Sequence, residues 1–414
     1  KSENYTPISL QLEDFSGYKP KEASAETKKY FQKKNREENN EIILKWYENM
    51  IANDSQLREK MTFFWTGIFA TRVVLSKFNL QYLNIIRENA LGNFGTLLLA
   101  VSQSPSMLQF LNNQQNKKDH PNENFAREVM ELFTMGRGNY TEKDIKEAAR
   151  AFTGWSFTPD GNFLMRPKFH DFGNKTFLGK TGNYDGTDIL KIILEQKATA
   201  KYIARRMYRF FVNEKIDETL VNQLAEKFYQ SNYDIKTILN EIFTSKWFYN
   251  EENIGTKIKS PIELMVEIQR ILPMSTENPQ ILITYQKLLG QMLFYPPNVA
   301  GWPSGKAWID SSTLMLRLKT PQIWSGIISL DYAPKDDDDL NMGMMQKMLP
   351  KNLQGNFKID WESVSKNLKD ENLEDILLQS KKSIPENVLN EFELKDEFKA
   401  RIIAIMSTPE YQLC

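Results

Sequence analysis

The helical character of the chain is clearest at residues 123–135, which read ENFAREVMELFTM. Successive residues of an α-helix are turned by about 100° around its axis. The apolar residues of this stretch therefore share one face, and the opposite face carries the polar residues Glu123, Asn124, Arg127, Glu128 and Glu131. This amphipathic pattern predicts a helix with one face packed on a core.

The same periodicity recurs in other parts of the chain. Residues 42–51, IILKWYENMI, carry an apolar stripe at three- and four-residue spacings. Helix starts are indicated by side chains that can cap free amide groups: Ser55, Asn93, Ser104 before Pro105, Asn122, Thr141 with Asp144, Asp217, Asp234 and Ser260 before Pro261. The sequence therefore predicts a mostly α, multi-helix globular fold.

Two stretches interrupt the helical pattern. Residues 154–186 contain too many glycines and prolines for a continuous helix. The turn signal at 159–161, PDG, lies between Phe157 and residues 163–165, which predicts a small β-hairpin insertion near residues 155–186 as the only sheet. Residues 295–305, YPPNVAGWPSG, contain three prolines and two glycines and predict a loop.

Composition shifts suggest three parts of the chain. We expect an N-terminal extension at residues 1–40, a main helical domain at 41–330, and a linker with a helical segment at 331–414. An aspartate run at 336–339, followed by several methionines, marks the expected linker. It lacks the spaced ligands and the closing glutamate of a calcium loop.

Charge and composition exclude several classes of protein. Lys+Arg 53 against Asp+Glu 53 gives no net charge, so a global attraction to nucleic acid is absent. Cys414 is the only cysteine, which excludes an internal disulfide, and the only histidines are His120 and His170, which exclude a three-histidine metal site.

The apolar runs are far shorter than the ~20 residues of a membrane span. Residues 1–5 lack a signal-peptide pattern. Any metal or cofactor stays unknown.

Three groups of residues could carry chemistry or bind a ligand. His170 and Asp171, with Lys175 nearby, could place an imidazole, a carboxylate and an ammonium in one loop; the alternative is a loop histidine bonded to backbone. The polar face at 123–131 could form a ladder of ion pairs on a solvated surface, or a buried acid/base or metal site if loops cover it. Trp302, which with Trp308 flanks residues 303–306, could form a platform for a sugar or peptide or fasten a loop to the core.

Several long motifs together resemble the bacterial family called domain of unknown function 1800. They are NENFAREVMELFT at 122–134, YTE at 140–142 with Asp144, AFTGW at 151–155, His170-Asp171 and PPNVAGWP at 296–303. The likeness runs from about Trp46 to Arg317, and STPEYQ at 407–412 resembles the end of the family. The usual N-terminal stretch of the family is not recognisable before residue 40.

The resemblance implies properties that the residues alone do not show. Family members are mostly helical and typically carry export signals, so an extracytoplasmic location, periplasmic or at the cell surface, is implied. Their genes often neighbour those of an exported sulfatase- or phosphatase-like family, which implies a protein partner. We include Trp155, within AFTGW, among the binding candidates. Because the resemblance covers the polar arc at 123–131, we expect loops to bury that arc.

Two departures from the family pattern bear on activity. This chain reads WTGIF at 65–69, where the family commonly has Trp-x-Asn-His-Phe, and Asn89 stands where the family commonly has histidine. The loss of both histidines favours an exported, non-catalytic helical binding or assembly protein. The alternative is a hydrolase with His170 as general base or metal ligand and with Asp171, Glu128 and Glu131 as carboxylate partners.

Overall fold

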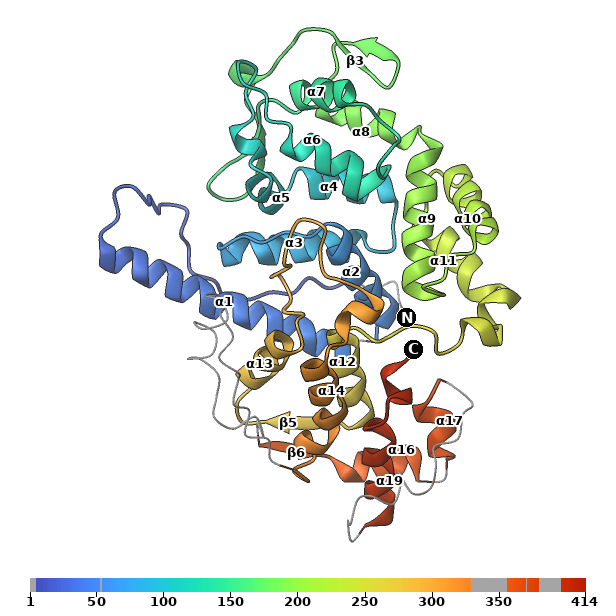
Figure 1. The fold of residues 1–414 in the computed structure, drawn as a ribbon. Helices are drawn as coiled ribbons and strands as arrows, with labels where there is room; N and C mark the ends of the chain where they lie inside the picture. Colours follow the sequence, from blue (N-terminus) through green and yellow to red (C-terminus); the bar gives the residue numbers. More distant parts are fainter. Residues whose placement is uncertain (1–4, 53, 329–355, 370, 380–395) are drawn as a thin grey trace. The chain divides into compact units, whose positions relative to one another are not determined.

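The protein is represented by a computed structural model that describes residues 5–52, 54–328, 356–369, 371–379 and 396–414 (Figure 1). Helices dominate, and the strands form only short antiparallel pairs, so the predicted mostly α fold is confirmed. The chain divides into two compact units. Unit 1 comprises residues 1–250 and 294–302, and unit 2 comprises residues 251–293 and 303–414.

Unit 1 is a helical body that carries a hairpin insertion. Its helices are α1 (Ala25–Ala52), α2 (Gln56–Ile68), α3 (Ser76–Asn89), α4 (Phe94–Ser102), α5 (Pro105–Phe110), η1 (Asn113–Gln115), α6 (Asn124–Glu128), η2 (Val129–Thr134), α7 (Glu142–Ala151), η3 (Pro167–Phe169), α8 (Gly186–Leu194), α9 (Lys197–Phe211), α10 (Glu218–Gln230), α11 (Ile235–Thr244) and η4 (Lys246–Tyr249). None of the helices in the described part of the chain is long and apolar enough to span a bilayer.

Local capping chemistry starts many of these helices where the sequence predicted. The side chains of Asn93, Asp217 and Asp234 each accept hydrogen bonds from the first turn of α4, α10 and α11. Thr141 and Asp144 form a reciprocal capping box at α7. Ser55 occupies the predicted cap position of α2, although its side chain makes no capping bond. At α6 the cap position is taken by Glu123, one residue after the predicted Asn122, whose side chain accepts the Asn124 N–H at 3.0 Å.

The core of unit 1 is rich in aromatic rings. Trp65 of α2 and Phe69, directly after this helix, stack at 5.9 Å between ring centroids, and Phe94 of α4 and Phe133 of η2 pack against them. All four side chains are at most 1% exposed. Burial of such rings removes a large apolar area from water and dominates the stability of a core.

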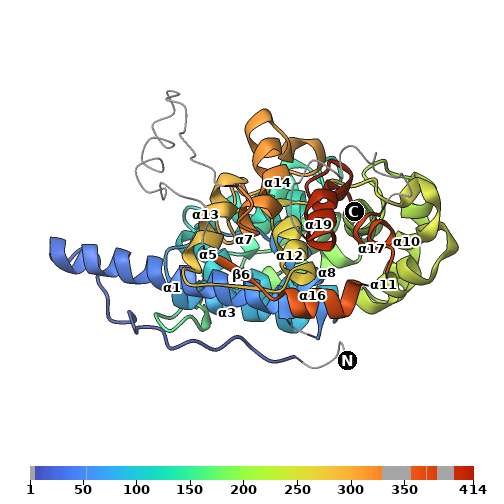
Figure 2. The same cartoon turned by 90° about the horizontal axis from the view of Figure 1, so that it is seen from below.

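A buried ion pair ties α2 to α3 inside this body. The Arg87 guanidinium donates to the Glu59 carboxylate, with 2.6 Å between Nη2 and Oε1, and each side chain is only 2% exposed. Trp46 of α1 donates its indole N–H to the same carboxylate at 3.1 Å. Helices α1 and α3 lie side by side in both views (Figures 1 and 2).

The stretch at 123–135 is not one regular α-helix. The α-helical turn of α6 passes directly into the π-helix η2. In a π-helix the hydrogen bonds span five residues instead of four. This wider turn breaks the four-residue alignment on which the predicted ladder from Glu123 through Arg127 to Glu131 depends.

The insertion contains two hairpins. The predicted hairpin is confirmed: β1 (Trp155–Phe157) pairs with β2 (Phe163–Met165), with Ser156 opposite Leu164. A second hairpin joins β3 (Lys175–Phe177) to β4 (Lys180–Gly182), and a third strand pair lies in unit 2. The expectation of a single sheet is therefore wrong.

The loop at 294–302 belongs to unit 1, and its motif serves packing. Phe294 packs against Trp46 at 5.6 Å between ring centroids. Gly301 has φ +86°, and a Cβ at this position would lie 2.5 Å from the backbone oxygen of Gly67 in α2. Only glycine permits that approach, which explains part of the PPNVAGWP motif.

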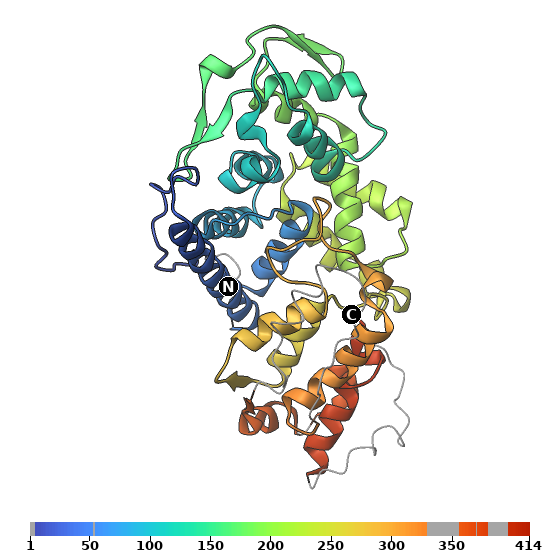
Figure 3. The same ribbon diagram turned by 60° about the vertical axis from the view of Figure 1, so that its left-hand side comes forward.

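Unit 2 is a smaller helical body. Its elements are η5 (Glu251–Asn253), α12 (Pro261–Ile271), β5 (Met274–Thr276), α13 (Gln280–Leu288), η6 (Gly305–Trp308), α14 (Ser311–Trp324), β6 (Phe357–Ile359), α16 (Trp361–Leu368), α17 (Leu373–Leu377), α19 (Glu397–Met406) and η7 (Glu410–Gln412). Helices α14 and α19, orange and red in Figure 3, contact one another.

The segment 408–412 is built into unit 2. The backbone amide of Lys259 donates to the Gln412 carbonyl at 2.8 Å, and Ile258 pairs with Leu413 in a β-bridge. The buried ammonium of Lys259 donates to the Tyr411 carbonyl at 2.7 Å and lies 3.9 Å from the centroid of the Tyr411 ring. The STPEYQ motif therefore supplies packing.

The two units divide the chain differently from the expected domains. Helix α1 crosses residue 40, so residues 25–40 continue into the same helix as residues 41–52. The expected boundary near residue 330 and the aspartate run at 336–339 lie outside the described residues.

Candidate functional site

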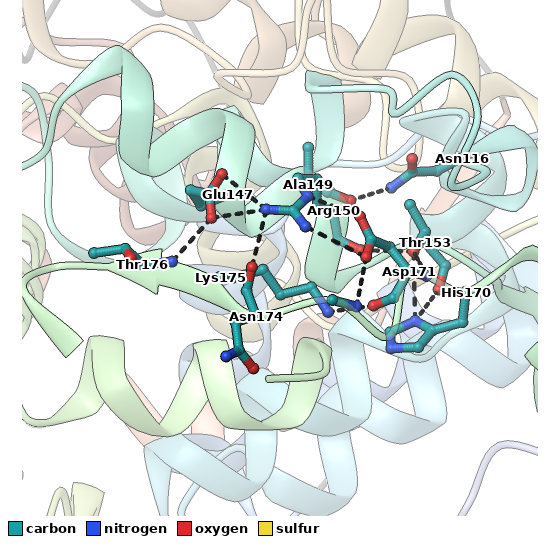
Figure 4. A network of polar contacts seen from close by, with 11 residues as sticks. Asn116, Glu147, Ala149, Arg150, Thr153, His170, Asp171, Asn174, Lys175 and Thr176 are labelled. Atoms are coloured by element: carbon teal, nitrogen blue, oxygen red, sulfur yellow. Dashed lines mark hydrogen bonds and ion pairs between the residues drawn. The ribbon is translucent and has the colours of Figure 1, made fainter. Parts of the chain in front are cut away.

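A polar network joins α7 to the hairpin insertion (Figure 4). Arg150, at the end of α7, donates from Nε to Asp171 Oδ2 at 2.7 Å and from Nη1 to Glu147 at 3.0 Å. Glu147 also accepts the backbone N–H of Thr176 at 2.9 Å. The network fastens β3 to α7 through charge-assisted hydrogen bonds.

Both the side chain and the backbone of Asp171 form hydrogen bonds in this network. Its Oδ1 accepts the Gly173 N–H at 2.8 Å, and its backbone N–H donates to the Thr153 hydroxyl at 2.9 Å. Burial raises the pKa of Asp171, but hydrogen bonds from Arg150 and Gly173 outweigh it and hold the pKa below 3.8. The carboxylate is an ionised structural partner at neutral pH.

His170 is buried, with 3% of its surface exposed. Its Nδ1 lies 2.8 Å from the carbonyl oxygen of Thr153. A carbonyl can only accept, so Nδ1 carries a proton and donates it to the Thr153 oxygen. Phe172 packs edge-on against the imidazole at 4.7 Å between ring centroids.

Lys175 is fully buried and also serves the fold. Its ammonium donates to the backbone carbonyl of Asp171. Burial lowers the pKa of Lys175, and the nearby Asp171 carboxylate opposes that shift. The structure therefore brings His170, Asp171 and Lys175 together, but their polar groups bond to Thr153, Arg150 and the Asp171 carbonyl.

A cleft of about 440 Å³ lies beside this network. Its lining residues are Gln114, Gln115, Asn116, Lys117, Gly154, Ser156, Arg166 and Phe169. They come from η1 and the turn after it, the first hairpin, and η3. Pockets of ~300–1,000 Å³ are the usual size for small-molecule sites.

Asn116 and Gly154 hold the inner wall of the cleft in place. Asn116 donates from Nδ2 to the Ala149 carbonyl at 2.8 Å and accepts the Asn122 N–H at 2.8 Å. Gly154 donates its N–H to the Asn116 carbonyl at 3.0 Å. With φ +80°, Gly154 sits where a Cβ would lie 2.7 Å from the Arg166 carbonyl. The glycine of AFTGW thus lets two segments of the wall touch.

The polar face at 123–131 is not buried by loops, so that expectation is wrong. The Arg127 side chain is 35% exposed and pairs with Glu123 at 3.3 Å and with Glu142 at 2.8 Å, whose side chain is 69% exposed. Glu131 pairs instead with Arg137 at 2.5 Å and accepts the Tyr140 hydroxyl at 3.2 Å. The apolar side of the stretch packs on the core, and the ion pairs lie near solvent.

Replacing Arg127 by alanine should lower the free energy of unfolding by less than about 1 kcal/mol, because exposed ion pairs contribute little. The urea-unfolding midpoint of Arg127→Ala at neutral pH measures this. A loss of ~3 kcal/mol or more would show that the arc is buried in solution.

Glu128 is the carboxylate of this stretch with the most unusual environment. The Glu128 side chain has no hydrogen bond or ion pair among the described residues. Burial raises its pKa, and the charge of Glu131 raises it further, while Arg127 and Arg137 oppose the shift. Burial and the same Glu131 charge raise the pKa of Tyr140 to about 12.

The raised pKa gives Glu128 a defined effect on stability. When folding raises the pKa of a carboxyl group, the group stabilises the folded protein at pH values below its pKa in the unfolded state. This contribution is lost as the pH rises through the pKa of the group in the folded state. Glu128→Gln should therefore raise the melting temperature at pH ~7 and change it little at pH ~4.

A matched control has the opposite sign. A hydrogen bond from Arg127 lowers the pKa of Glu142, so Glu142→Gln should lower the melting temperature at neutral pH. Equal shifts for the two variants, measured by calorimetry, would contradict the assigned environments.

The other candidate residues occupy ordinary structural positions. Trp155 is 2% exposed and packs between Phe152 and Phe163 in the core, so its ring does not present a binding surface. Trp302 is half-buried, and its indole N–H is buried with no acceptor among the described residues. Asn124 is exposed and donates to the Leu111 carbonyl at 3.2 Å.

Among the described residues, no hydrogen bond joins His170 to Glu128 or Glu131, the carboxylates of the hydrolase alternative, or to Glu123. No cluster of three or more His, Cys, Asp or Glu that could hold a metal ion occurs in the described ranges. At the two positions where the chain departs from the family pattern, Ile68 is buried in α2 and Asn89 donates to the Ile85 carbonyl at 2.9 Å.

These features define a mostly α-helical protein with a polar cleft beside a hairpin insertion. Residues 4–413 match the family model described as "Protein of unknown function (DUF1800)", and the chain belongs to this family. The match extends beyond the expected range of 46–317 and includes the residues before 40, where the N-terminal stretch of the family was not recognisable from the sequence. No curated protein and no solved structure matches the chain.

Sequence reasoning missed most of the residues that line the cleft. Gln114, Gln115 and Lys117 belong to the stretch NQQNKKDH at 113–120, and Arg166 and Phe169 lie in the insertion. A loop of amides and lysines directly before the amphipathic stretch was the available signal. It has no periodicity, and nothing in the sequence shows that it folds against residues 154–169.

Proposed function

We propose that the protein is an exported, non-catalytic binding protein whose site is the cleft lined by Gln114, Lys117, Ser156 and Arg166. One observation carries the proposal. The polar groups of His170, Asp171 and Lys175 are bonded to Thr153, Arg150 and the Asp171 carbonyl. The Gln114 carboxamide oxygen of the cleft, in contrast, accepts no hydrogen bond from any described residue.

The contrast is clearest in the carboxamide of Gln114. Its Oε1 is buried and accepts no hydrogen bond from any described residue. An unpaired buried acceptor costs about 1–3 kcal/mol, so such groups are commonly satisfied by water or by a ligand. Asp171, by comparison, accepts from Arg150 and Gly173 without any ligand.

The hydrolase alternative is less well supported. A general base needs a reacting atom within about 3 Å of it or one water away. His170 is 3% exposed, does not line the cleft, and has the Phe172 ring packed against its imidazole. Its bonding to the Thr153 carbonyl matches the ordinary role of a loop histidine.

The exported location and a protein partner, including an exported sulfatase- or phosphatase-like protein, are parts of the proposal that rest on the family resemblance. Cell fractionation of the native host tests the location. Cross-linking before purification, followed by mass spectrometry, tests the partner. Recovery of the protein in the cytoplasmic fraction would contradict the proposed location.

Turnover and binding can be separated in one panel. For turnover, the parent and His170→Gln proteins are incubated with p-nitrophenyl esters, phosphates, sulfates and glycosides. For binding, both proteins are mixed with small polar compounds and their melting temperatures are measured in a thermal-shift assay. We expect at least one compound class to raise the melting temperature and no p-nitrophenol release above that of the variant. Release by the parent alone, with matching circular dichroism spectra, would establish a hydrolase and contradict the proposal.

A further inference from the structure

We infer that the cleft binds the anionic group of a small polar ligand, a carboxylate, sulfate or phosphate, between Lys117 and Arg166. This inference rests on the proposed binding function and specifies the chemistry of its ligand. Three independent features of the cleft support it: two cations without carboxylate partners, neutral hydrogen-bonding groups beside them, and a rigid wall.

The two cations that line the cleft are available to a ligand. Neither Lys117 nor Arg166 has an ion pair with any carboxylate in the described part of the chain. The Lys117 ammonium lies 4.8 Å from the centroid of the Phe169 ring, a cation–π contact that keeps it at the cleft. The Arg166 backbone amide donates to the Gly154 carbonyl at 2.8 Å, which fixes the start of its side chain.

The surroundings of the cleft are positive although the chain as a whole is neutral. The stretches 114–120 and 166–169 contain Lys117, Lys118, Arg166 and Lys168 against one carboxylate, Asp119. Asp171 and Glu147 of the neighbouring network both pair with Arg150, and neither carboxylate lines the cleft. A cleft with an excess of one charge attracts ligands of the opposite charge.

Neutral groups beside the cations suit the polar remainder of a ligand. The Ser156 hydroxyl projects from β1 with no hydrogen bond to any described residue, although Ser156 is only 4% exposed. The Gln114 carboxamide, whose Oε1 is buried and unpaired, lines the same cleft. Hydroxyl and carboxamide groups bind the hydroxyls of a ligand, and the volume of about 440 Å³ fits a small sugar.

The backbone segments that carry these groups are held together by hydrogen bonds without a ligand. Asn116 is bonded to Ala149 and Asn122, and the Lys118 N–H donates to the Phe169 carbonyl at 2.9 Å. These bonds tie the turn after η1 to η3, so Lys117 and Arg166 are presented from connected backbone segments. A preformed site loses less entropy on binding than a flexible one.

The test uses one sugar ring with different substituents. Glucuronate, glucose 6-sulfate and glucose 6-phosphate are titrated into the full chain by calorimetry, with glucose as the neutral control. We expect at least one anion to bind more tightly than glucose and its affinity to fall in ~0.5 M salt. The anion that binds identifies the source of the charge.

Paired substitutions locate the site. Lys117→Gln and Arg166→Gln should each weaken binding about tenfold, the usual effect of losing one charge-assisted hydrogen bond. Lys118→Gln and Lys168→Gln remove the same charge from neighbouring residues that do not line the cleft, and should leave the affinity within about twofold.

Three results would overturn the inference. Equal weakening in all four variants would indicate a non-specific effect of net charge, and the absence of binding by all three anions would exclude an anion site. Glucose binding as tightly as the anions would also overturn the inference but would leave the proposed binding function standing. The proposed function itself fails on a different result, the His170-dependent turnover described above.

Discussion

Replacing Arg87 by alanine should lower the free energy of unfolding of unit 1 by about 3–5 kcal/mol, the usual cost of breaking a buried ion pair. The buried Glu59 carboxylate would lose the guanidinium that donates to it from Nε and Nη2. The Thr6 carbonyl would also lose its 2.9 Å hydrogen bond from Nη1. Urea unfolding followed by tryptophan fluorescence measures the change.

Arg137 supplies a matched control for this prediction. It also pairs with a glutamate, Glu131, at 2.5 Å, but its side chain is 85% exposed. Arg137→Ala should leave the urea-unfolding midpoint close to that of the parent, because exposed ion pairs contribute little. Similar losses for the two variants would contradict the burial of the Glu59–Arg87 pair.

Replacing Tyr411 by alanine should destabilise unit 2 by about 3–5 kcal/mol, the typical cost of removing a large buried aromatic ring. The Tyr411 ring is 0% exposed, and the Lys259 ammonium, with 1% of its side chain exposed, lies over it. The variant would leave a cavity and deprive a desolvated cation of its aromatic neighbour.

Tyr411→Phe separates the ring from the hydroxyl. Because it keeps the aromatic face over Lys259, we expect it to cost less than about 1 kcal/mol. Thermal unfolding of both variants gives the comparison. A loss for Tyr411→Phe as large as that for Tyr411→Ala would show that the ring contact is not what stabilises the segment 408–412.

Local chemistry made much of the fold predictable. Capping residues such as Asn93, Asp217 and Asp234 satisfy amide groups within their own first turn, so their effect can be recognised from a few neighbouring residues. The turn at 159–161 likewise joins two strands that are adjacent in sequence. Such short-range interactions need no knowledge of the rest of the chain.

Features that depend on distant partners were not predictable. The second hairpin is held by contacts to α7, including the Leu178 N–H to Asp144 at 2.9 Å, across 34 residues of sequence. The π-helix η2 has the same amphipathic residue pattern as an α-helix, so periodicity alone did not reveal it. The third strand pair joins Met274 to Ile359, which are far apart in sequence.

The candidate site shows the same division. His170, Asp171 and Lys175 are close in sequence, and the structure places them in one network. Whether their polar groups can reach a ligand or are bonded within the fold depends on contacts with Arg150, Thr153 and the surrounding backbone. The spacing of residues in the sequence does not predict these contacts. The cleft depends on two segments about 40 residues apart folding against one another.

The central claim is that a ligand occupies the cleft while the His170–Lys175 segment is structural. Lysine acetylation with and without glucuronate, glucose 6-sulfate or glucose 6-phosphate, read by mass spectrometry, tests it most directly, because Lys117 lines the cleft and the adjacent Lys118 does not. The account predicts that at least one of the three ligands protects Lys117 and leaves Lys118 reactive. Equal modification of the two lysines with every ligand present would contradict it.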